Sequence, residues 1–293
     1  MDVSVIIVSY NASHLLRDCI ASILQYTADI EYEIIVVDNH SQDDSRHMVE
    51  KEFPGAILIK NNENAGFGSA NNAGFKLAKG KYVLFLNPDT LLLSNAIKDF
   101  FSFMERSENA DVFACGGKLV QKDLTPNKSY GNFPSVPEIM ITALRLGRVL
   151  PAAVMDRISS GVIPKGAAAI EVDYIVGADL FLRRSAVGAG EPFDKDFFLY
   201  FEETELCYRL KAKGYRAVIL PFVAIVHLEG RSSSDKNYQT YALSQLMYLA
   251  KCRGRRSAAF IKRFIMALFL LRYLTTFRKT YIQKYAFYRK LAF

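Results

Sequence analysis

Residues 3–11 have the sequence VSVIIVSYN, and residues 33–39 have the sequence EIIVVDN. Each is a run of apolar, mostly β-branched side chains that ends in polar residues, which is typical of a strand buried on both faces. Between them, apolar residues recur at the spacing of a helix. A chain that passes from strand to helix to strand through short connections is expected to form a parallel sheet covered by helices.

The same alternation continues along the chain. The loop NNENAGFG at residues 61–68 leads into a helix that ends near Gly80, and a helix at residues 202–214 ends at Gly214. Residues 121–170 hold five of the nine prolines, and we expect a long, partly helical excursion over the active face. Further strands are predicted at residues 56–60, 81–86, 172–176, 216–220 and 223–227.

The chain has 293 residues, of which 51% are apolar and 23% are charged, so a large core is possible and global disorder is excluded. Its net charge of +7 is unevenly distributed. No Asp or Glu follows Asp235, and residues 236–293 contain 13 Lys and Arg, whereas residues 1–235 carry a net charge of −6. The basic charge therefore belongs to the tail, and it gives no reason to expect nucleic-acid binding.

The four cysteines are widely spaced and form no CxxC pair, so we expect reduced thiols in a cytoplasmic protein. The N-terminus has an acid, Asp2, and no basic segment, which argues against a signal peptide. The longest apolar run of the tail, residues 264–271, is shorter than the ~20 residues that a membrane-spanning helix needs.

The tail is predicted to be helical, with an apolar side opposite a basic side. We interpret it as a helix that lies on an anionic membrane surface, within residues 251–293. The alternative is a helix packed on the protein's own body with its basic side in solvent. The apolar side consists of Phe260, Ile261, Phe264, Ile265 and Leu268, and the basic side of Arg255, Arg256, Lys262 and Arg263.

Polar residues follow the predicted strands, at the edge where ligands bind in parallel α/β sheets. They are Ser9-Tyr10-Asn11, Asp38-Asn39, Asn64 with Gly66-Phe67-Gly68, and Asn87-Pro88-Asp89. Asp38 could accept hydrogen bonds from a base or a ribose, although acids are also common in turns. The asparagines of the loop could bind sugar or base edges, although its glycines also permit a simple turn.

Two positions favour a metal site. Asp89 follows a strongly apolar strand and suits a hard divalent cation, although Asn-Pro-Asp is also a good turn sequence. His227 ends the run VAIVH and could complete a Mn²⁺ or Mg²⁺ site, although a lone histidine after a strand is more often structural. Arg231 and Ser232 follow it and could hold phosphate oxygens.

Three acids, Glu202, Glu203 and Glu205, begin the predicted helix at residues 202–214. Acids stabilise the first turn of a helix, which is the simpler explanation. The five residues before them are aromatic or aliphatic, however, and partial desolvation would raise a carboxyl pKa toward the range of a general base.

Together these segments resemble the inverting glycosyltransferases of family 2, and most closely the rhamnosyltransferase-like branch with the nucleotide-diphospho-sugar (GT-A) fold. The resemblance covers residues 3–235, and seven segments in one order make it specific. They are VSVIIVSYN, EIIVVDNHSQDDS, NNENAGFGSANNAG, YVLFLNPDT, GADLFLRR, FDKDFFLYFEETELCYRLKAKGY and VHLEGRSS.

The resemblance implies an α/β fold with a mostly parallel central sheet flanked by helices. Residues 1–235 would form the GT-A domain, and residues 236–293 would form a basic helical tail. Within the domain, residues 1–95 would be the nucleotide-binding half and residues 96–235 the acceptor and catalytic half.

The resemblance also implies a donor site. Asp38 matches the acid that recognises the base, and Tyr10 and Asn64 match the pocket around the base and ribose. Asp89 matches the metal-binding acid of a DxD-type motif, and His227 matches a second metal ligand. The other expected donor contacts are Ser9, Asn87 (in the first position of that motif), Arg231 and Ser232.

The catalytic base is implied in the same way. Glu203 matches the second acid of the family's Glu-Asp pair, where relatives usually have Asp. Glu202 beside it is expected to contact the acceptor. Asp179 stands where relatives often have an apolar residue, and it could contact the acceptor sugar or be buried and paired.

The predicted activity is a metal-dependent, inverting hexosyl transfer. The donor would be dTDP-rhamnose or a UDP-sugar, and the acceptor a hydroxyl of a glycan or lipid-linked sugar in cell-surface polysaccharide synthesis, at the inner face of the cell membrane. A nucleotidyltransferase should carry a basic, glycine-rich loop after the first strand, where this chain has SYNASHLL. An inactive sugar-nucleotide-binding protein or membrane scaffold remains the alternative.

Overall fold

The computed structural model describes residues 1–150, 161, 163, 169–228 and 235–293. The chain forms two compact units. The first contains Met1–Asn132, Ser160–Phe198 and Glu202–Arg231, and the second contains Phe133–Ser159, Leu199–Phe201 and Ser232–Phe293. The second unit thus includes two earlier segments that the sequence did not assign to the tail.

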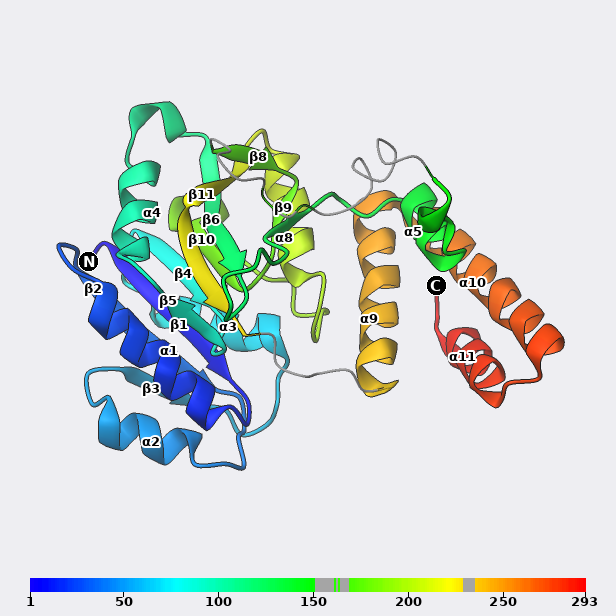
Figure 1. Cartoon of the computed structure of the whole chain (residues 1–293), viewed down its shortest axis with the longest axis horizontal. Helices are drawn as coiled ribbons and strands as arrows, with labels where there is room; N and C mark the ends of the chain where they lie inside the picture. Colours follow the sequence, from blue (N-terminus) through cyan, green and yellow to red (C-terminus); the bar gives the residue numbers. More distant parts are fainter. Residues whose placement is uncertain (151–160, 162, 164–168, 229–234) are drawn as a thin grey trace. The chain divides into compact units, whose positions relative to one another are not determined.

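A central sheet organises the first unit (Figure 1). Its strands are β1 (Val3–Ser9), β2 (Tyr32–Asp38), β3 (Ile57–Lys60), β4 (Tyr82–Leu86), β5 (Thr90–Leu92), β6 (Val112–Val120), β8 (Ile170–Val172), β10 (Asp179–Arg183) and β11 (Arg216–His227). Their order is β3-β2-β1-β4-β10-β6-β11-β5, with β8 beside β11. The pairs within β3-β2-β1-β4 and the pair β6-β11 are parallel, and β10, β5 and β8 run antiparallel to their neighbours.

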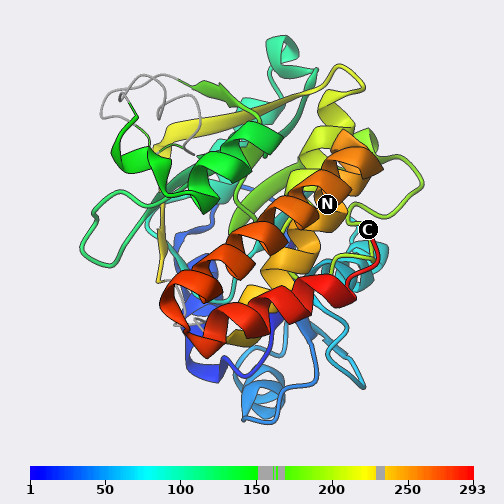
Figure 2. The ribbon, with the colours of Figure 1, turned by 90° about the vertical axis from the view of Figure 1, so that its right-hand side faces the viewer.

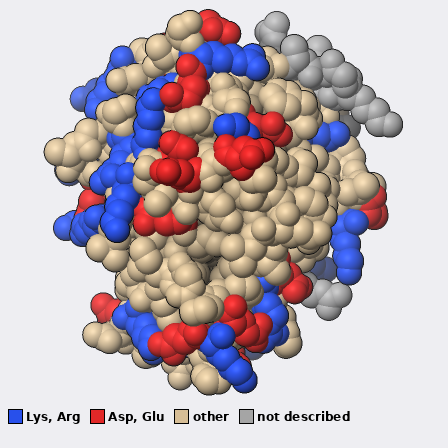
Figure 3. All heavy atoms as spheres, turned by 90° about the vertical axis from the view of Figure 1, so that its left-hand side faces the viewer, with Lys and Arg blue, Asp and Glu red and all other residues tan. Residues whose placement is uncertain are grey.

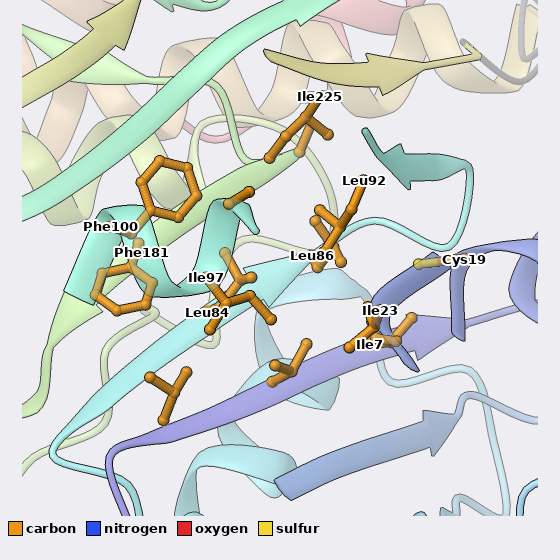
Figure 4. Packing of buried hydrophobic residues seen from close by; sticks show 14 of the residues in the cluster. Ile7, Cys19, Ile23, Leu84, Leu86, Leu92, Ile97, Phe100, Phe181 and Ile225 are labelled. Atoms are coloured by element: carbon orange, nitrogen blue, oxygen red, sulfur yellow. The ribbon is translucent and has the colours of Figure 1, made fainter. Parts of the chain in front are cut away.

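Helices flank this sheet, so the predicted α/β fold is confirmed. They are α1 (Ser13–Tyr26), α2 (Ser45–Glu52), α3 (Phe67–Leu77), α4 (Ala96–Met104), α7 (Arg184–Val187) and α8 (Glu202–Lys211). Two short strands, β7 (Tyr130–Gly131) and β9 (Tyr174–Ile175), form a separate ladder. Side chains from the sheet and from α1 and α4 pack into one apolar cluster. Figure 4 shows its members Ile7, Cys19, Ile23, Leu84, Leu86, Leu92, Ile97, Phe100, Phe181 and Ile225.

The strand register brings the polar strand ends together. Ser9 lies opposite Asp38, and Ile7 lies opposite Leu86 of β4. Asp179 lies on the other side of Leu86, because β10 pairs with β4. The carboxyl ends of β1, β2 and β4 therefore share one edge with the start of β10.

The prediction of two closing strands at residues 216–220 and 223–227 was wrong. The structure has one strand, β11, whose pairing with β6 shifts between Leu220 and Ala224. Pro221 falls inside this shift and has no backbone N–H to donate, so the ladder is interrupted while the strand continues.

The second unit is helical, which confirms that the tail forms helices. Its main helices are α5 (Val136–Ala143), α9 (Asp235–Tyr248), α10 (Arg255–Thr276) and α11 (Lys279–Lys290). α10 and α11 lie side by side (Figure 2). Helix α5 belongs to the predicted excursion at residues 121–170, of which residues 151–160, 162 and 164–168 lie outside the described ranges.

The predicted faces of the tail helix were partly wrong. The buried side of α10 consists of Ala258, Ile261, Ile265 and Phe269, so Ile261 and Ile265 are buried as predicted. Phe260 lies on the exposed side instead. The apolar residues of that side are Phe260, Leu270, Leu271 and Leu274, with Phe277 directly after the helix.

Surface charge and thiols are unremarkable in the first unit. On the face in Figure 3, Lys and Arg alternate with Asp and Glu and no large region has one sign. Cys19, Cys115 and Cys207 are buried and form no disulfide. Burial raises the pKa of Cys19 and of Cys207 to about 12, so both of these thiols are protonated at neutral pH. Among the helices that the structure describes, none has the length and apolar character needed to cross a bilayer.

Candidate active site

Asp89 and His227 lie next to each other at the end of the sheet. Asp89 directly precedes β5, His227 is the last residue of β11, and these strands pair so that Thr90 lies opposite His227. The backbone N–H of Leu228 donates to the Asp89 carbonyl at 2.9 Å. As a result, Asp89 Oδ1 is 3.4 Å from His227 Nε2, and the two side chains are 13% and 14% exposed. An oxygen and a nitrogen from distant parts of the chain thus meet where solvent can still reach them.

Asn87 lies between this pair and the start of β10. Its N–H donates to the Ala178 carbonyl at 3.0 Å, and its carbonyl accepts from Thr90 Oγ1 at 2.7 Å. Its side-chain Oδ1 is buried and accepts no hydrogen bond from the described residues. These hydrogen bonds hold the backbone of the turn Asn87-Pro88-Asp89 in place. They leave the side-chain oxygen Oδ1 of Asn87 without a hydrogen-bond donor among the described residues.

Asp38 is buried at the end of β2. Its Oδ2 accepts hydrogen bonds from the Ser41 N–H at 3.1 Å and from Arg46 Nε, while Arg46 also binds the Asn61 carbonyl. Its Oδ1 is buried and has no partner in the described part of the chain. Oδ2 therefore has the hydrogen bonds of a turn residue, which was one of the two roles expected from the sequence. Oδ1 can still accept a hydrogen bond from a group outside the described residues.

The asparagine loop is held by Asn39, which follows Asp38. Asn39 Nδ2 donates to Asn64 Oδ1 at 2.8 Å, and Asn39 Oδ1 accepts from Asn61 Nδ2 at 3.0 Å and from the Ala65 N–H at 3.1 Å. Asn64 Oδ1 also accepts from the Gly66 N–H. The amide group of Asn64 is thus oriented by the loop itself.

The remaining loop amides serve the fold. Asn71 Nδ2 donates to the Phe67 carbonyl one turn earlier in α3. Asn72 Nδ2 donates to the Phe193 carbonyl at 2.7 Å, and its Oδ1 accepts from the Phe193 N–H at 3.1 Å. The Nδ2 group of Asn71 and both polar side-chain atoms of Asn72 therefore bind backbone groups of the fold.

Ser9 and Tyr10 end β1 beside Asp38. The Ser9 carbonyl accepts from the Asn39 N–H at 2.8 Å, and Ser9 Oγ is buried without a hydrogen bond to any described residue. The Tyr10 side chain is half exposed. Ser9 thus adds a buried hydroxyl to the polar residues at this edge of the sheet, and the ring of Tyr10 is accessible to solvent.

Glu202 and Glu203 begin α8. Burial, together with the neighbouring Glu203 carboxylate, raises the pKa of Glu202 well above its usual range. Burial also raises the pKa of Glu203, although less neighbouring protein covers this side chain. A Cβ added to Gly177 would lie 3.7 Å from Glu203 Cγ, so Glu203 lies against the residue before Ala178, whose carbonyl binds Asn87.

Asp179 is completely buried. Its Oδ2 accepts from the Gly117 N–H at 2.6 Å, and its burial raises the pKa of the carboxyl well above the usual range. Of the two alternatives that the sequence left open, the structure has the buried, hydrogen-bonded one. Asp179 is fully buried and Glu202 is 4% exposed, and their contact with the acceptor sugar stays a prediction.

Buried oxygens without a hydrogen bond gather at this edge of the sheet. Among the described residues they include Ser9 Oγ, Asp38 Oδ1, Asn87 Oδ1, Asp179 Oδ1 and Glu202 Oε2. Because buried polar groups in folded proteins are nearly always partnered, such a concentration is typical of a ligand site. Arg231 and Ser232, which were expected to hold phosphate, lie outside the described residues.

Sequence reasoning missed Arg46, and it named Asn39 at the strand end without giving it a role. Arg46 binds the Asp38 carboxylate, and Asn39 connects β2 to the asparagine loop. The segment EIIVVDNHSQDDSR contains both, but side-chain pairing of Asp38 with a residue in the next helix leaves no periodic signal.

The family follows from a comparison of the sequence with models of known families. The model described as "Glycosyl transferase family 2" matches residues 4–162, which is more than half of the chain. The chain belongs to glycosyl transferase family 2. The resemblance inferred from the seven segments is thereby confirmed.

Curated relatives of this family-2 chain are bacterial glycosyltransferases. Rhamnosyltransferase WbbL of Escherichia coli is 27% identical over 252 residues, which are 82% of this chain and 91% of that protein. The glucosyltransferase WfaP of Escherichia coli, named for a GlcNAc-diphosphoundecaprenol substrate, is 33% identical over 143 residues, or 48% of this chain and 55% of that one.

Solved structures support the fold of this family-2 chain. Staphylococcus aureus TarS residues 1–349 superpose with a TM-score of 0.56 at 16% identity, covering 94% of this chain and 72% of TarS. GalNAc-T7 with UDP, GalNAc and Mn²⁺ gives a TM-score of 0.59 at 15% identity, covering 87% of this chain and 51% of that one. These likenesses show the GT-A fold.

Proposed function

We propose that this protein transfers a sugar from a nucleotide-diphospho-sugar to a hydroxyl of a glycan or lipid-linked acceptor, with inversion at the anomeric carbon. The family assignment establishes a glycosyltransferase. The name of WbbL supports transfer of rhamnose, and that of WfaP supports a UDP-sugar donor and a lipid-linked acceptor. The donor is proposed to be dTDP-rhamnose or a UDP-sugar, and the process to be cell-surface polysaccharide synthesis.

The observation that carries this proposal is the 3.4 Å approach of Asp89 Oδ1 to His227 Nε2 at the carboxyl edge of the sheet. A carboxylate oxygen and an imidazole nitrogen suit Mn²⁺ or Mg²⁺. Within the described residues no cluster of three or more His, Cys, Asp or Glu forms, so the remaining ligands would be donor oxygens and water. Asp89 and His227 would hold such a cation, which would supply positive charge to the diphosphate leaving group.

The chain's own groups then have distinct tasks. Asp38 Oδ1 and Ser9 Oγ are buried hydrogen-bond acceptors for the nucleoside, with Tyr10 as a ring beside it. Glu203 accepts the proton of the acceptor hydroxyl as that oxygen attacks the anomeric carbon from the face opposite the diphosphate. The bond to the diphosphate breaks, and the nucleoside diphosphate leaves.

The site of action is proposed to be the inner face of the cell membrane, with the protein bound to the membrane surface from the cytoplasm. The exposed row of α10 contains three leucines and Phe260, and Phe277 follows directly after the helix. Leu271, Leu274 and Phe277 are 58%, 58% and 76% exposed. Basic residues flank this row, and no acid occurs after Asp235. An apolar row within a basic segment is suited to an anionic lipid surface.

The experiment that tests the reaction uses a panel of dTDP- and UDP-sugars with Mn²⁺ or Mg²⁺. A donor that binds the native protein raises its melting temperature, and transfer is then measured with that donor. We expect Asp89→Asn to lose the metal-dependent part of the shift. We expect Glu203→Gln to keep the shift and to lower kcat roughly 10²–10⁴-fold.

Each outcome bears on a separate part of the proposal. No shift with any donor would contradict the sugar-nucleotide site. A shift without transfer or donor hydrolysis in the wild type would favour the inactive binding protein. Near-normal turnover of Glu203→Gln would remove Glu203 as the base.

A further inference from the structure

The two oxygens of the buried Asp38 carboxylate have different surroundings. The side chain is 1% exposed. Oδ2 accepts hydrogen bonds from the Ser41 N–H at 3.1 Å and from Arg46 Nε, whereas Oδ1 accepts none from the described residues. Both oxygens belong to one planar group, so the donors that hold Oδ2 also determine where Oδ1 lies. Ser41 and Arg46 therefore set the direction of the oxygen that is proposed to accept from the nucleoside.

Arg46 is itself fixed through two of its guanidinium nitrogens. Nε donates to Asp38 Oδ2, and Nη2 donates to the Asn61 carbonyl at 3.0 Å. The Asn61 N–H donates in turn to the Asp38 carbonyl at 2.9 Å. These three hydrogen bonds form a closed ring that joins the end of β2, the residue after β3 and the first turn of α2. Because a guanidinium group is planar and donates in fixed directions, this ring holds the carboxylate in one orientation.

Ser41 provides its contact with Asp38 independently of Arg46. Ser41 Oγ accepts from the Asn11 N–H at 3.0 Å, and Asn11 Oδ1 accepts from the Gln42 N–H at 2.7 Å. These bonds connect the segment after β1 to the segment after β2. Loss of the Arg46 side chain would therefore leave the Asp38 carboxylate in its place with one donor on Oδ2, but able to tilt.

We propose that Arg46 is a positioning residue for the donor nucleoside and acts through Asp38. It holds Oδ2 so that Oδ1 lies in the one direction from which it accepts a hydrogen bond from the nucleoside. Arg46 thus determines the affinity for the donor and takes no part in the transfer step. This inference rests on the proposed donor site at Asp38.

The first test measures nucleotide binding and turnover separately in the full chain. UDP and dTDP are the probes, and the one that the wild type binds more tightly is used throughout. We expect Arg46→Leu to raise the Kd of that nucleotide and the donor KM roughly 10-fold, because a misdirected hydrogen bond to a charged group loses affinity by about that factor. At saturating donor, kcat should change less than about twofold, as expected for a lost binding interaction.

Arg46→Lys is a conservative second variant. It keeps the positive charge but lacks the planar pair of donors that connects Asp38 to Asn61. A cation remains beside the buried carboxylate, so this variant is expected to fold even where Arg46→Leu does not. We expect its Kd to lie between those of the wild type and Arg46→Leu, with kcat unchanged. A wild-type Kd in Arg46→Lys would show that the planar contact is not required, and would overturn the inference.

Arg17→Leu is the matched control. Arg17 of α1 also pairs with a carboxylate of α2, since its Nε donates to Glu52 Oε2 at 2.7 Å and its Nη2 to Glu52 Oε1 at 2.8 Å. This variant removes an arginine–carboxylate pair from the same helix without touching Asp38, and its nucleotide Kd should stay within about twofold of the wild type. A comparable loss in Arg17→Leu and Arg46→Leu would show a general disturbance of α2 and overturn the inference.

A double-mutant cycle separates positioning from direct contact between Arg46 and the nucleotide. Asp38→Ala removes the group that Arg46 holds, so Arg46→Leu should reduce affinity less than about twofold further in that background. An equal loss in both backgrounds would show that Arg46 acts on the nucleotide itself, and would overturn the inference. A wild type that binds neither UDP nor dTDP, with or without Mn²⁺, would instead overturn the proposed donor site, and the inference with it.

Discussion

Glu202 combines burial with a neighbouring acid. It is 4% exposed, its Oε2 has no hydrogen bond among the described residues, and Glu203 follows it. Desolvation and the adjacent carboxylate both disfavour its ionised form, so its pKa lies above the value of the unfolded chain. The folded protein therefore binds a proton at Glu202 more readily than the unfolded chain does.

This raised pKa predicts a pH-dependent stability. The contribution of Glu202 is complete below the unfolded pKa of about 4.3 and is lost as pH rises through the folded pKa. We expect Glu202→Gln to remove this loss and to be more stable than the wild type near neutral pH by about 1–3 kcal/mol. Urea unfolding of both proteins from pH 5 to 8 measures the difference, which should grow with pH.

A constant difference across that range would contradict the assigned cause. Because Glu203 is coupled to Glu202, the same series in Glu203→Gln shows how much of the effect belongs to the pair.

At the scale of elements, α3 and the segment before α8 approach each other closely at Gly66. Gly66 has a φ of +84°, and a Cβ there would lie 2.4 Å from the Phe198 carbonyl oxygen. The glycine therefore permits both the turn into α3 and the backbone contact with Phe198. The asparagine loop and the segment that leads to α8 are joined at this point.

Gly66→Ala should destabilise the protein by about 1–3 kcal/mol and lower kcat, because the backbone must move away from Phe198. Gly214→Ala is a matched control, since Gly214 has a φ of +91° and no neighbour within 4 Å of an added Cβ. Chemical denaturation and transfer assays of both variants measure the two effects. If Gly66→Ala were no worse than Gly214→Ala, the close approach would have no energetic consequence.

At the scale of the whole molecule, charge is segregated along the chain. Residues 1–235 carry a net charge of −6, and all 13 charged residues after Asp235 are basic. The exposed apolar row of α10 lies within this basic segment. Both features are the basis of the proposed binding to an anionic membrane surface.

Membrane binding is testable by flotation with vesicles. We expect the wild type to float with vesicles that contain an anionic phospholipid and to bind neutral phosphatidylcholine weakly, because each basic side chain near an anionic surface contributes about 1 kcal/mol. The double variant Leu271→Glu with Leu274→Glu should reduce binding at least roughly tenfold. Leu77→Glu, at a half-exposed leucine of α3, is the control. Equal flotation of the double variant would show that this row does not contact lipid.

The sequence determined the fold class and the family, because both depend on local signals. Buried strands, amphipathic helices and glycine-rich turns alternate in order, and the segments that carry the family resemblance are continuous. The polar residues that end the strands were also found this way, and their gathering at one edge follows from parallel pairing. The assigned roles of those residues remain predictions.

Only the tertiary structure decided which side chains are paired and which are free to act. Burial of Asp179, the approach of Arg46 to Asp38 and the 3.4 Å distance between Asp89 and His227 depend on strand register between segments far apart in sequence. The buried side of α10 depends on the helices that pack against it, since a helix with apolar residues on two sides gives no local indication of which side is covered. Periodicity records that a residue is apolar or polar; the neighbours that long-range packing brings to it determine what it does.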